Sequence, residues 1–223
     1  LKMGRKYESQ DCVDKELRYG RVIFMTDQDL DGSHIKGLGI NLFQSEWPEL
    51  TIIPGFIGFM NTPILRATKG KEIKMFYNDG EYNEWKAQDE EMAKKWTIKY
   101  YKGLGTSTSK EFKEYFKEKK FVTFKHNGDV TNDAIDKVFN KKRADDRKDW
   151  LGDYDANLFL DTNKPEVEYN EFIDREMIHF SKYDNDRSIP NVMDGLKLSL
   201  RKILFSVFKR NLTKEIKVAQ LSG

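Results

Sequence analysis

The most specific string in the chain is TDQDLDGSH, at residues 26–34, which places Asp27, Asp29 and Asp31 at alternating positions. It follows the apolar run RVIFM, which has the composition of a buried strand that feeds a loop. Carboxylates that alternate at a strand end can point to one side, where their like charges repel. A hard divalent cation such as Mg²⁺ relieves this repulsion and keeps positions open for water and substrate phosphates. We therefore predict that the three aspartates hold Mg²⁺ for phosphoryl transfer on nucleic acid, against the simpler alternative of a solvated acidic turn.

The same residues can be compared with two other known kinds of acidic loop. A calcium-binding EF-hand loop would begin at Asp27 and would need a bidentate glutamate at its twelfth position, which is Leu38. A strand also precedes the loop where an EF-hand requires a helix, so calcium sensing is disfavoured. A phosphatase of the haloacid dehalogenase kind would use Asp29 as nucleophile and Asp31 as acid/base, although Ser33 stands where threonine is usual. This phosphatase remains the alternative enzymatic hypothesis.

A second candidate site is the glycine-containing string YYKGLGTST at residues 100–108. It places Lys102 on a flexible loop at the start of a helix, where free backbone N–H groups and the helix dipole favour an anion such as a DNA phosphate. Thr108, followed three residues later by Glu111, predicts a capping box at that helix start. The spacing matches neither a dinucleotide-binding fingerprint nor a Walker A loop, and a plain turn before a capped helix explains the same letters.

Basic residues are concentrated near the end of the chain, where Glu215 is the one acid among seven cations. The cations are Lys197, Arg201, Lys202, Lys209, Arg210, Lys214 and Lys217. Such a segment can neutralise phosphates without reading bases, although a solvated helix face has the same pattern. The segment also carries an apolar stripe at helical spacing, which predicts a buried helix face. The stripe consists of Leu200, Ile203, Leu204, Val207 and Phe208.

Composition narrows the class of protein. The 223 residues are 34% charged and 13% aromatic, so the chain has apolar area for a core beneath a heavily charged surface. The net charge of +2 neither supports nor excludes a polyanion partner. A single cysteine, Cys12, excludes an internal disulfide framework and is typical of a reducing compartment. No apolar run approaches the roughly 18 residues of a membrane span, so we expect a soluble protein with no membrane partner.

The order of elements predicts an α/β fold. Strand-like and helix-like runs alternate over residues 1–125, which we expect to form one domain. Residues 126–166 are polar and rich in Asp, Asn and Lys, and we interpret them as a charged connector. Residues 167–223 have mostly helical patterns. Both ends look like cuts, because the chain has no initial methionine and stops directly after an apolar stretch.

Several long strings, in a fixed order, resemble the eukaryotic type IIA DNA topoisomerases. RVIFMTDQDLDGSHIKGL is similar to the acidic signature of their Toprim domain, and KYYKGLGTSTSKEFKEYF to the later Toprim strand and helix. DDRKDWL, EYNEFIDREMIHFS and DNDRSIPNVMDGLK follow in the family's order, and FKRNLTKEIKVAQLSG resembles the opening of its winged-helix domain. The resemblance implies a Toprim-type parallel sheet flanked by helices over residues 1–125, incomplete at its N-terminus. A mostly helical start of a winged-helix DNA-binding domain would follow at residues 167–223.

The resemblance also implies roles for individual residues. Asp27 and Asp29, supported by Asp31, would hold the catalytic Mg²⁺, and Lys102 would lie near the scissile region of the double-stranded DNA. The residues expected on the backbone of the cleaved DNA segment are Arg187, Lys197, Arg201 and Lys202. In the family, metal ions stabilise the phosphate while a tyrosine attacks it. The resulting 5′-phosphotyrosyl link lets a second duplex pass, driven by ATP, and the family further implies a homodimer in the nucleus.

The resemblance predicts that this piece is incomplete as an enzyme. The Toprim glutamate, a metal ligand and acid/base, should precede the chain, the nucleophilic tyrosine should follow it, and ATP should bind outside it. We therefore expect no DNA cleavage by the piece alone. The family's DGLKPGQRK reads DGLKLSLRK here, so Leu198 replaces a proline and Leu200 a glutamine near Lys197, which affects the expected helix start and DNA contacts. The non-enzymatic alternative is a DNA-binding scaffold, which mutation of the three aspartates would distinguish from a catalyst.

Overall fold

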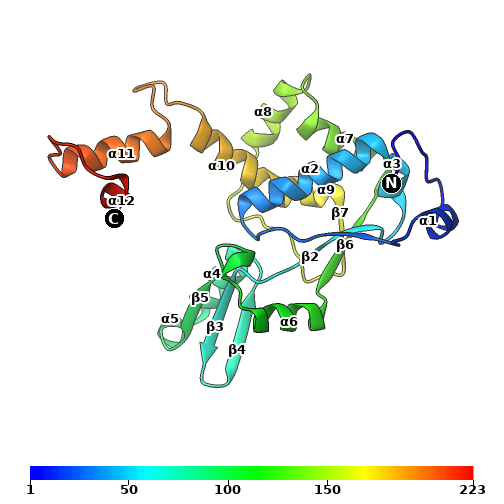
Figure 1. The fold of residues 1–223 in the computed structure, drawn as a ribbon, viewed down its shortest axis with the longest axis horizontal. Coiled ribbons are helices and arrows are strands. Elements are labelled where there is room, and N and C mark those ends of the chain that lie inside the picture. The colour runs from blue at the N-terminus through cyan, green and yellow to red at the C-terminus, as the bar shows by residue number, and fades with distance from the viewer. Residues whose placement is uncertain (223) are drawn as a thin grey trace. The chain divides into compact units, whose positions relative to one another are not determined.

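The chain forms two compact units in the computed structural model, which describes residues 1–222 (Figure 1). The first unit is Leu1–Phe180, and the second begins at Ser181. Within the described residues, no helix has both the length and the apolar character needed to cross a membrane.

A four-stranded sheet with the order β1, β2, β6, β7 forms the centre of the first unit. Its strands are β1 (Val22–Phe24), β2 (Ile57–Met60), β6 (Phe121–Lys125) and β7 (Glu166–Glu168). β1 is parallel to β2 and β6 is parallel to β7, whereas β2 and β6 are antiparallel. The predicted α/β fold, with a sheet that contains parallel strands and is flanked by helices, is confirmed. β1 was predicted to be buried, but it is only half-buried because it lies at the sheet edge and pairs with β2 alone.

A second sheet, antiparallel and three-stranded, has the order β4, β3, β5. Its strands are β3 (Leu65–Lys69), β4 (Glu72–Phe76) and β5 (Thr97–Tyr100). β3 and β4 form a hairpin around Gly70, whose φ of +60° suits glycine. This sheet has a small core of its own, rich in aromatic rings. That core contains Ile64, Leu65, Ala67, Phe76, Trp85, Ala93 and Trp96.

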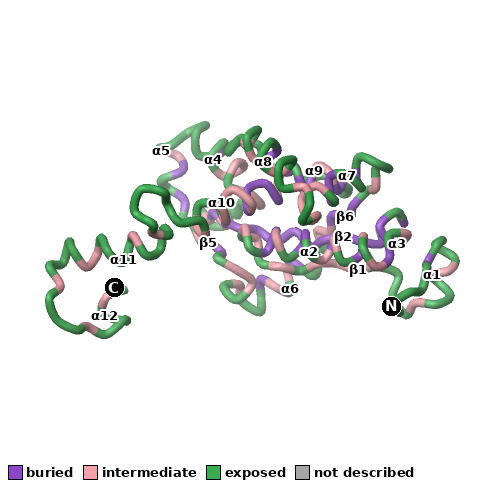
Figure 2. Tube along the Cα trace, turned by 90° about the horizontal axis from the view of Figure 1, so that it is seen from above, coloured by how far each residue is buried: buried purple, intermediate pink, exposed green. Residues whose placement is uncertain are grey.

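Helices cover the four-stranded sheet. Figure 1 shows α2, α7 and α9 on one side of it, and α6 with the three-stranded sheet on the other. The helices of the first unit are α1 (Gln10–Glu16), α2 (Leu30–Glu46), α3 (Pro48–Ile52), α4 (Asp79–Gln88), α5 (Glu90–Ala93), α6 (Ser109–Glu118), α7 (Gly128–Phe139), α8 (Ala144–Gly152) and α9 (Tyr169–Phe172), with a 3₁₀ turn, η1 (Leu104–Thr106), and a π-helical turn, η2 (Ile173–Met177). α10 (Ile178–Ser188) begins in the first unit and ends in the second, which also contains α11 (Leu198–Lys209) and α12 (Val218–Ser222). Figure 2 shows β2 as a buried strand at the centre of the main core.

The predicted connector, residues 126–166, is packed into the first unit. Ile135 of α7 is 1% exposed and Trp150 of α8 is 8% exposed, and both belong to the main core. The compact unit continues to Phe180 rather than ending before this segment. The high content of charged residues therefore did not reveal that the helices of this segment, α7 and α8, face the core. The boundary between a Toprim part and a winged-helix part stays a prediction.

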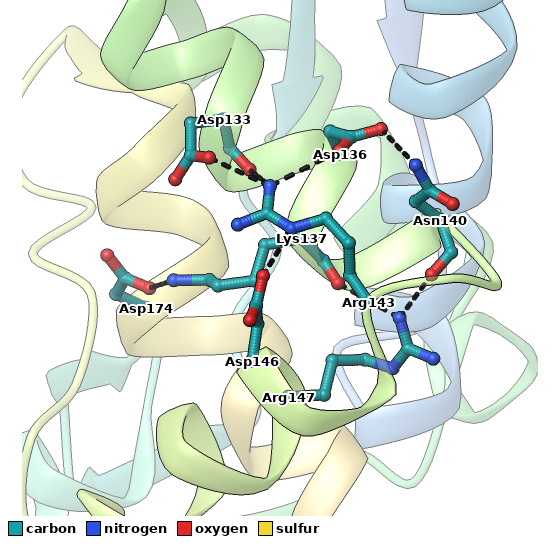
Figure 3. A network of polar contacts seen from close by, with 8 residues as sticks. All are labelled: Asp133, Asp136, Lys137, Asn140, Arg143, Asp146, Arg147 and Asp174. Atoms are coloured by element: carbon teal, nitrogen blue, oxygen red, sulfur yellow. Dashed lines mark hydrogen bonds and ion pairs between the residues drawn. The ribbon is translucent and has the colours of Figure 1, made fainter.

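Arg143 holds α7 and α8 together, as Figure 3 shows. Its guanidinium contacts Asp133 and Asp136 of α7 at 2.8 and 3.2 Å, and Asp146 of α8 at 2.5 Å. Hydrogen bonds that the guanidinium donates to Asp146 and Asp133 raise the pKa of Arg143 above its usual value. Arg147 donates to two backbone carbonyl oxygens at the end of α7, which satisfies acceptors that a helix end leaves open. Ion pairs and hydrogen bonds between the acidic and basic side chains of this segment thus hold α7 and α8 together.

The apolar stripe of α11 is exposed in the second unit. Leu200 is 50% exposed and Phe208 is 73% exposed, and α11 contains no buried residue. Figure 2 shows the same for α12. The helix itself was predicted and is present, with its start at Leu198 despite the missing proline. The prediction that its stripe is buried is wrong for the described residues, because nothing in the second unit covers it there.

Candidate functional site

The acidic loop joins the end of β1 to the start of α2. Asp29 is the N-cap of α2, with an extended backbone (φ −98°, ψ 176°), and its Oδ1 accepts a hydrogen bond from the N–H of Gly32 at 2.7 Å. A short acidic side chain suits this position because it satisfies a free N–H group and faces the positive end of the helix dipole. The local structure therefore uses one oxygen of Asp29 and leaves Oδ2 for a ligand.

Gly32 allows the first turn of α2 to fold against the loop. A Cβ at this position would lie 1.9 Å from the carbonyl oxygen of Asp27, far closer than atoms can approach. Only glycine has no such atom, so the DxDG spacing has a steric reason in addition to its charges. The close approach makes the acidic loop and the helix start a single local structure. Asp27, Asp29 and Asp31 are all exposed on it.

Asp27 connects the acidic loop with the glycine loop. Its Oδ1 accepts a hydrogen bond from the N–H of Leu104 at 2.6 Å. The backbone of Gly103 lies so near that a Cβ there would be 2.8 Å from Oδ2 of Asp27. The two motifs, which are 77 residues apart, are thus in direct contact. Sequence patterns identified each motif but could not establish that they meet.

The donor set of the acidic loop suits a hard cation. Asp27 and Asp29 offer exposed carboxylate oxygens, and Asp31 lies in the first turn of α2. Across residues 1–222, no group of three or more His, Cys, Asp or Glu side chains is arranged to hold a metal ion. The loop therefore has the oxygen chemistry of a Mg²⁺ site without a complete protein cage, and Mg²⁺ is an ion that keeps several waters. Its binding to these aspartates stays a prediction.

Glu111 connects the glycine loop with the three-stranded sheet. The predicted capping box is confirmed: Thr108 Oγ1 accepts from the N–H of Glu111 at 3.3 Å, and Glu111 Oε2 accepts from the N–H of Thr108 at 2.7 Å. The carboxylate also accepts from the hydroxyl of Tyr101 at 2.5 Å and from Lys99 at 2.9 Å, and contacts Arg66 at 3.3 Å. Glu111 is only 6% exposed. The sequence predicted the cap but not this larger set of donors.

The partners of Glu111 fix its charge. Burial by itself raises the pKa of Glu111, but hydrogen bonds from Thr108, Tyr101 and Lys99 outweigh burial and lower the pKa to about 2. Burial, together with the hydrogen bond to Glu111, raises the pKa of Tyr101. The carboxylate is therefore ionised near neutral pH, and the phenol remains a protonated donor.

The three predicted DNA-binding lysines are exposed. Lys102 lies on the glycine loop, next to the backbone that contacts Asp27. Lys197 is the N-cap residue of α11, and Lys202 lies in its early turns. Exposed ammonium groups on flexible stems can approach phosphate oxygens as point charges. Their contact with DNA stays a prediction.

The two predicted DNA-binding arginines already have acidic neighbours. Arg201 forms hydrogen bonds of 2.7 Å to both carboxylate oxygens of Asp194, and donates to the carbonyl oxygen of Leu196. This pairing lowers the pKa of Asp194 to about 2. Arg187 donates to Asp184 at 3.0 Å. Each arginine is thus partly neutralised by an aspartate of the second unit. These two residues are therefore weaker candidates for phosphate contacts than the lysines.

Comparison with known proteins identifies the family. The family model described as the C-terminal associated domain of TOPRIM matches residues 60–185, more than half of the chain. DNA topoisomerase 2 of Plasmodium falciparum is 47% identical over 211 residues, which cover 94% of this chain and 15% of that protein. Human DNA topoisomerase 2-alpha is 46% identical over 237 aligned residues, which cover 100% of this chain and 15% of that protein. The chain belongs to the TOPRIM-containing DNA topoisomerase 2 family.

Two further matches agree with this assignment. A family model for DNA gyrase and topoisomerase IV matches residues 187–223. The crystal structure of the Plasmodium falciparum topoisomerase II DNA-binding, cleavage and re-ligation domain is similar with a TM-score of 0.83 and 45% identity, over 99% of this chain and 30% of that chain. The chain thus spans about 15% of the length of these two curated topoisomerase 2 relatives.

A buried ion pair that the sequence did not reveal also fixes α2. Lys36 pairs with Glu176 of η2, and the hydroxyl of Ser33 donates to the same carboxylate at 2.7 Å. Lys36 is 1% exposed, and its ammonium lies 4.5 Å from the centre of the Phe59 ring. The paired residues are 140 positions apart, so no local pattern could join them. The helix that follows the acidic loop is therefore held in place by charge as well as by apolar packing.

Proposed function

We propose that this chain is part of the DNA cleavage and re-ligation core of an ATP-dependent type II topoisomerase. In this function Mg²⁺ assists transesterification of DNA phosphodiesters, so that a second duplex can pass through the break. The similarity to the DNA-binding, cleavage and re-ligation domain of Plasmodium falciparum topoisomerase II supports the function. The hydrogen bond between Asp27 and Leu104 carries the proposal for the site, because it joins the acidic loop and the Lys102 loop.

Asp27 and Asp29 would hold Mg²⁺, with Asp31 in support. Each of the first two carboxylates has one oxygen bound to a backbone N–H, which fixes its orientation, and a second oxygen for the ion. When bound, Mg²⁺ supplies positive charge that stabilises a phosphate as its bonds are exchanged. The chain's own contribution is to keep the two carboxylates in place at the end of β1, beside the glycine loop.

The lysines would position the DNA. Lys102 lies on the loop that contacts Asp27, so its ammonium can neutralise a phosphate next to the acidic site. Lys197 and Lys202 would contact the backbone of the same DNA segment without reading its sequence. Each such contact releases counterions, which makes the binding of DNA dependent on salt.

We propose that the attacking tyrosine comes from outside these 223 residues. Tyr101 is the buried tyrosine beside the glycine loop, and its hydroxyl already donates to Glu111. Burial raises the pKa of Tyr101, which makes the phenol a poor nucleophile near neutral pH. We further propose that the ATP site also lies outside this chain, and that the complete protein is a nuclear homodimer that acts on double-stranded DNA. The phosphatase hypothesis is set aside, because the chain belongs to a topoisomerase family.

The test is covalent DNA cleavage by the full-length protein in Mg²⁺, with and without Asp29→Asn. Asparagine caps a helix about as well as aspartate, so this variant removes the metal-binding charge and keeps the start of α2. Asp129→Asn, at an exposed position in α7, is the matched control for charge. We expect tyrosine-linked breaks in the natural protein and the control but not in Asp29→Asn, with DNA binding retained in all three. Equal cleavage by Asp29→Asn would exclude the acidic loop from the chemistry and leave the scaffold hypothesis.

A further inference from the structure

The loop between β5 and α6 is fixed at both ends by one carboxylate. On its N-terminal side, the hydroxyl of Tyr101 donates to Glu111 at 2.5 Å. On its C-terminal side, the N–H and the hydroxyl of Thr108 donate to the other oxygen of Glu111 at 2.7 and 2.9 Å. Residues 102–107 therefore form a short closed loop whose two ends meet at the same side chain.

The middle of this loop holds Asp27. The N–H of Leu104 donates to Oδ1 of Asp27, and the backbone of Gly103 is packed against the carboxylate. A shift of the loop must therefore move the N–H that orients Asp27, or break that hydrogen bond. Glu111 can therefore influence the orientation of the Asp27 carboxylate without direct contact, because Glu111 fixes the loop and the loop holds Asp27.

The surroundings of Glu111 suit a fixed anchor. The residue is 6% exposed, and Lys99 and Arg66 of the three-stranded sheet supply positive charge to its carboxylate. An ionised carboxylate with several charge-assisted donors is held more strongly than a neutral helix cap. A capping box by itself needs only the two contacts with Thr108. The contacts with Tyr101, Lys99 and Arg66 go beyond capping and tie the loop to the sheet.

We propose that Glu111 is a positioning residue for the metal site, acting on Asp27 through the loop of residues 102–107. The proposal rests on the function proposed above, in which Asp27 holds Mg²⁺. Residues that orient a metal ligand typically change metal affinity about 10-fold to 100-fold when they are lost. Because Glu111 acts through a loop rather than by direct contact, we expect the lower end of that range.

The test measures DNA cleavage by the full-length protein as a function of Mg²⁺ concentration. Glu111→Gln keeps the size of the side chain and removes the charge that holds Lys99 and Arg66. We expect the Mg²⁺ concentration for half-maximal cleavage to rise about tenfold, with maximal cleavage recovered at high Mg²⁺. The dissociation constant of Mn²⁺ from the full-length protein without ATP, measured from the electron paramagnetic resonance of free Mn²⁺ and independent of cleavage, should rise by a similar factor. Glu118→Gln, an exposed change of the same charge on α6, is expected to leave the Mg²⁺ dependence unchanged. A merely structural role would lower thermal stability or the amount of active protein, but it would not shift this half-maximal concentration.

Two more variants distinguish a failure of the positioning role from a failure of the proposed metal site. Tyr101→Phe removes one hydroxyl from the N-terminal end of the loop, and we expect it to raise the half-maximal Mg²⁺ concentration by less than Glu111→Gln does. This variant also tests the positioning role if Glu111→Gln does not fold. Asp27→Asn tests the underlying function, and we expect it to abolish cleavage at all Mg²⁺ concentrations. If Asp27→Asn abolishes cleavage while the folded Glu111→Gln and Tyr101→Phe variants keep the natural Mg²⁺ dependence, the positioning role is wrong and the metal site stands. If Asp27→Asn cleaves normally, the metal site itself is wrong, and the positioning role with it.

Discussion

Replacement of Glu176 by alanine is expected to destabilise the first unit by about 3 kcal/mol, at the lower end of the range for breaking a buried ion pair. The side chain of Lys36 is 2% exposed and that of Glu176 is 18% exposed, so the change leaves an ammonium group enclosed without its counter-charge. The hydroxyl of Ser33 loses an acceptor at the same time. The Phe59 ring remains near the ammonium and offsets a part of the loss.

The assay is urea unfolding followed by tryptophan fluorescence. All four tryptophans lie within residues 1–180, so the signal reports on the first unit. The double variant Lys36→Met, Glu176→Ala removes both charges, and we expect it to recover most of the lost stability, because an apolar side chain can replace a buried pair at little cost. Asp145→Ala breaks an exposed pair with Lys148 and is the control, with little expected change. A loss below about 1 kcal/mol for Glu176→Ala, typical of a surface pair, would refute the reasoning.

Three other predictions follow from the geometry. Gly32→Ala is expected to destabilise the first unit by at least about 2 kcal/mol, measured by the same unfolding assay, because the new Cβ would overlap the carbonyl of Asp27. The pKa of Glu111 is about 2 in the folded chain against an ordinary 4.5. Its charge therefore contributes stability that is fully present above pH 4.5 and is lost as the pH falls toward 2. The difference in unfolding free energy between the natural chain and Glu111→Gln should shrink as the pH is lowered across that range. Lys202→Ala is expected to reduce the slope of log K for DNA binding against log salt by about 0.9, whereas Arg201→Ala should reduce it less, because that arginine is already paired.

Local signals in the sequence predicted local structure well. The capping box of Thr108 and Glu111 and the helix that became α11 both depend on residues within a few positions of one another. The three-residue spacing of the cap is sufficient for its local geometry. The alternation of strand-like and helix-like runs predicted the α/β fold, and the family resemblance added the expectation of a parallel sheet flanked by helices.

Packing between distant segments could not be predicted in the same way. Ile35 and Leu38 of α2 are large apolar residues, yet they are 55% and 47% exposed. Besides Ile40 and Phe43, the packed face of that helix includes Lys36 and Gly37, because Lys36 has a distant carboxylate partner and Gly37 lies against Met177. Charge and small size are poor signals of burial unless the partner is known. The contact between the acidic loop and the glycine loop could not be predicted either, because its two partners, Asp27 and Leu104, are far apart in the sequence.

The most direct test of the metal site is anomalous X-ray diffraction from crystals of the cleavage core with DNA, grown with Mn²⁺ in place of Mg²⁺. Mn²⁺ accepts the same oxygen ligands and can be located by its scattering. We expect an anomalous peak at the carboxylates of Asp27 and Asp29, and its loss in crystals of Asp27→Asn. A well-ordered acidic loop with no peak beside either carboxylate, in crystals where Mn²⁺ supports cleavage, would contradict the proposed role of these aspartates.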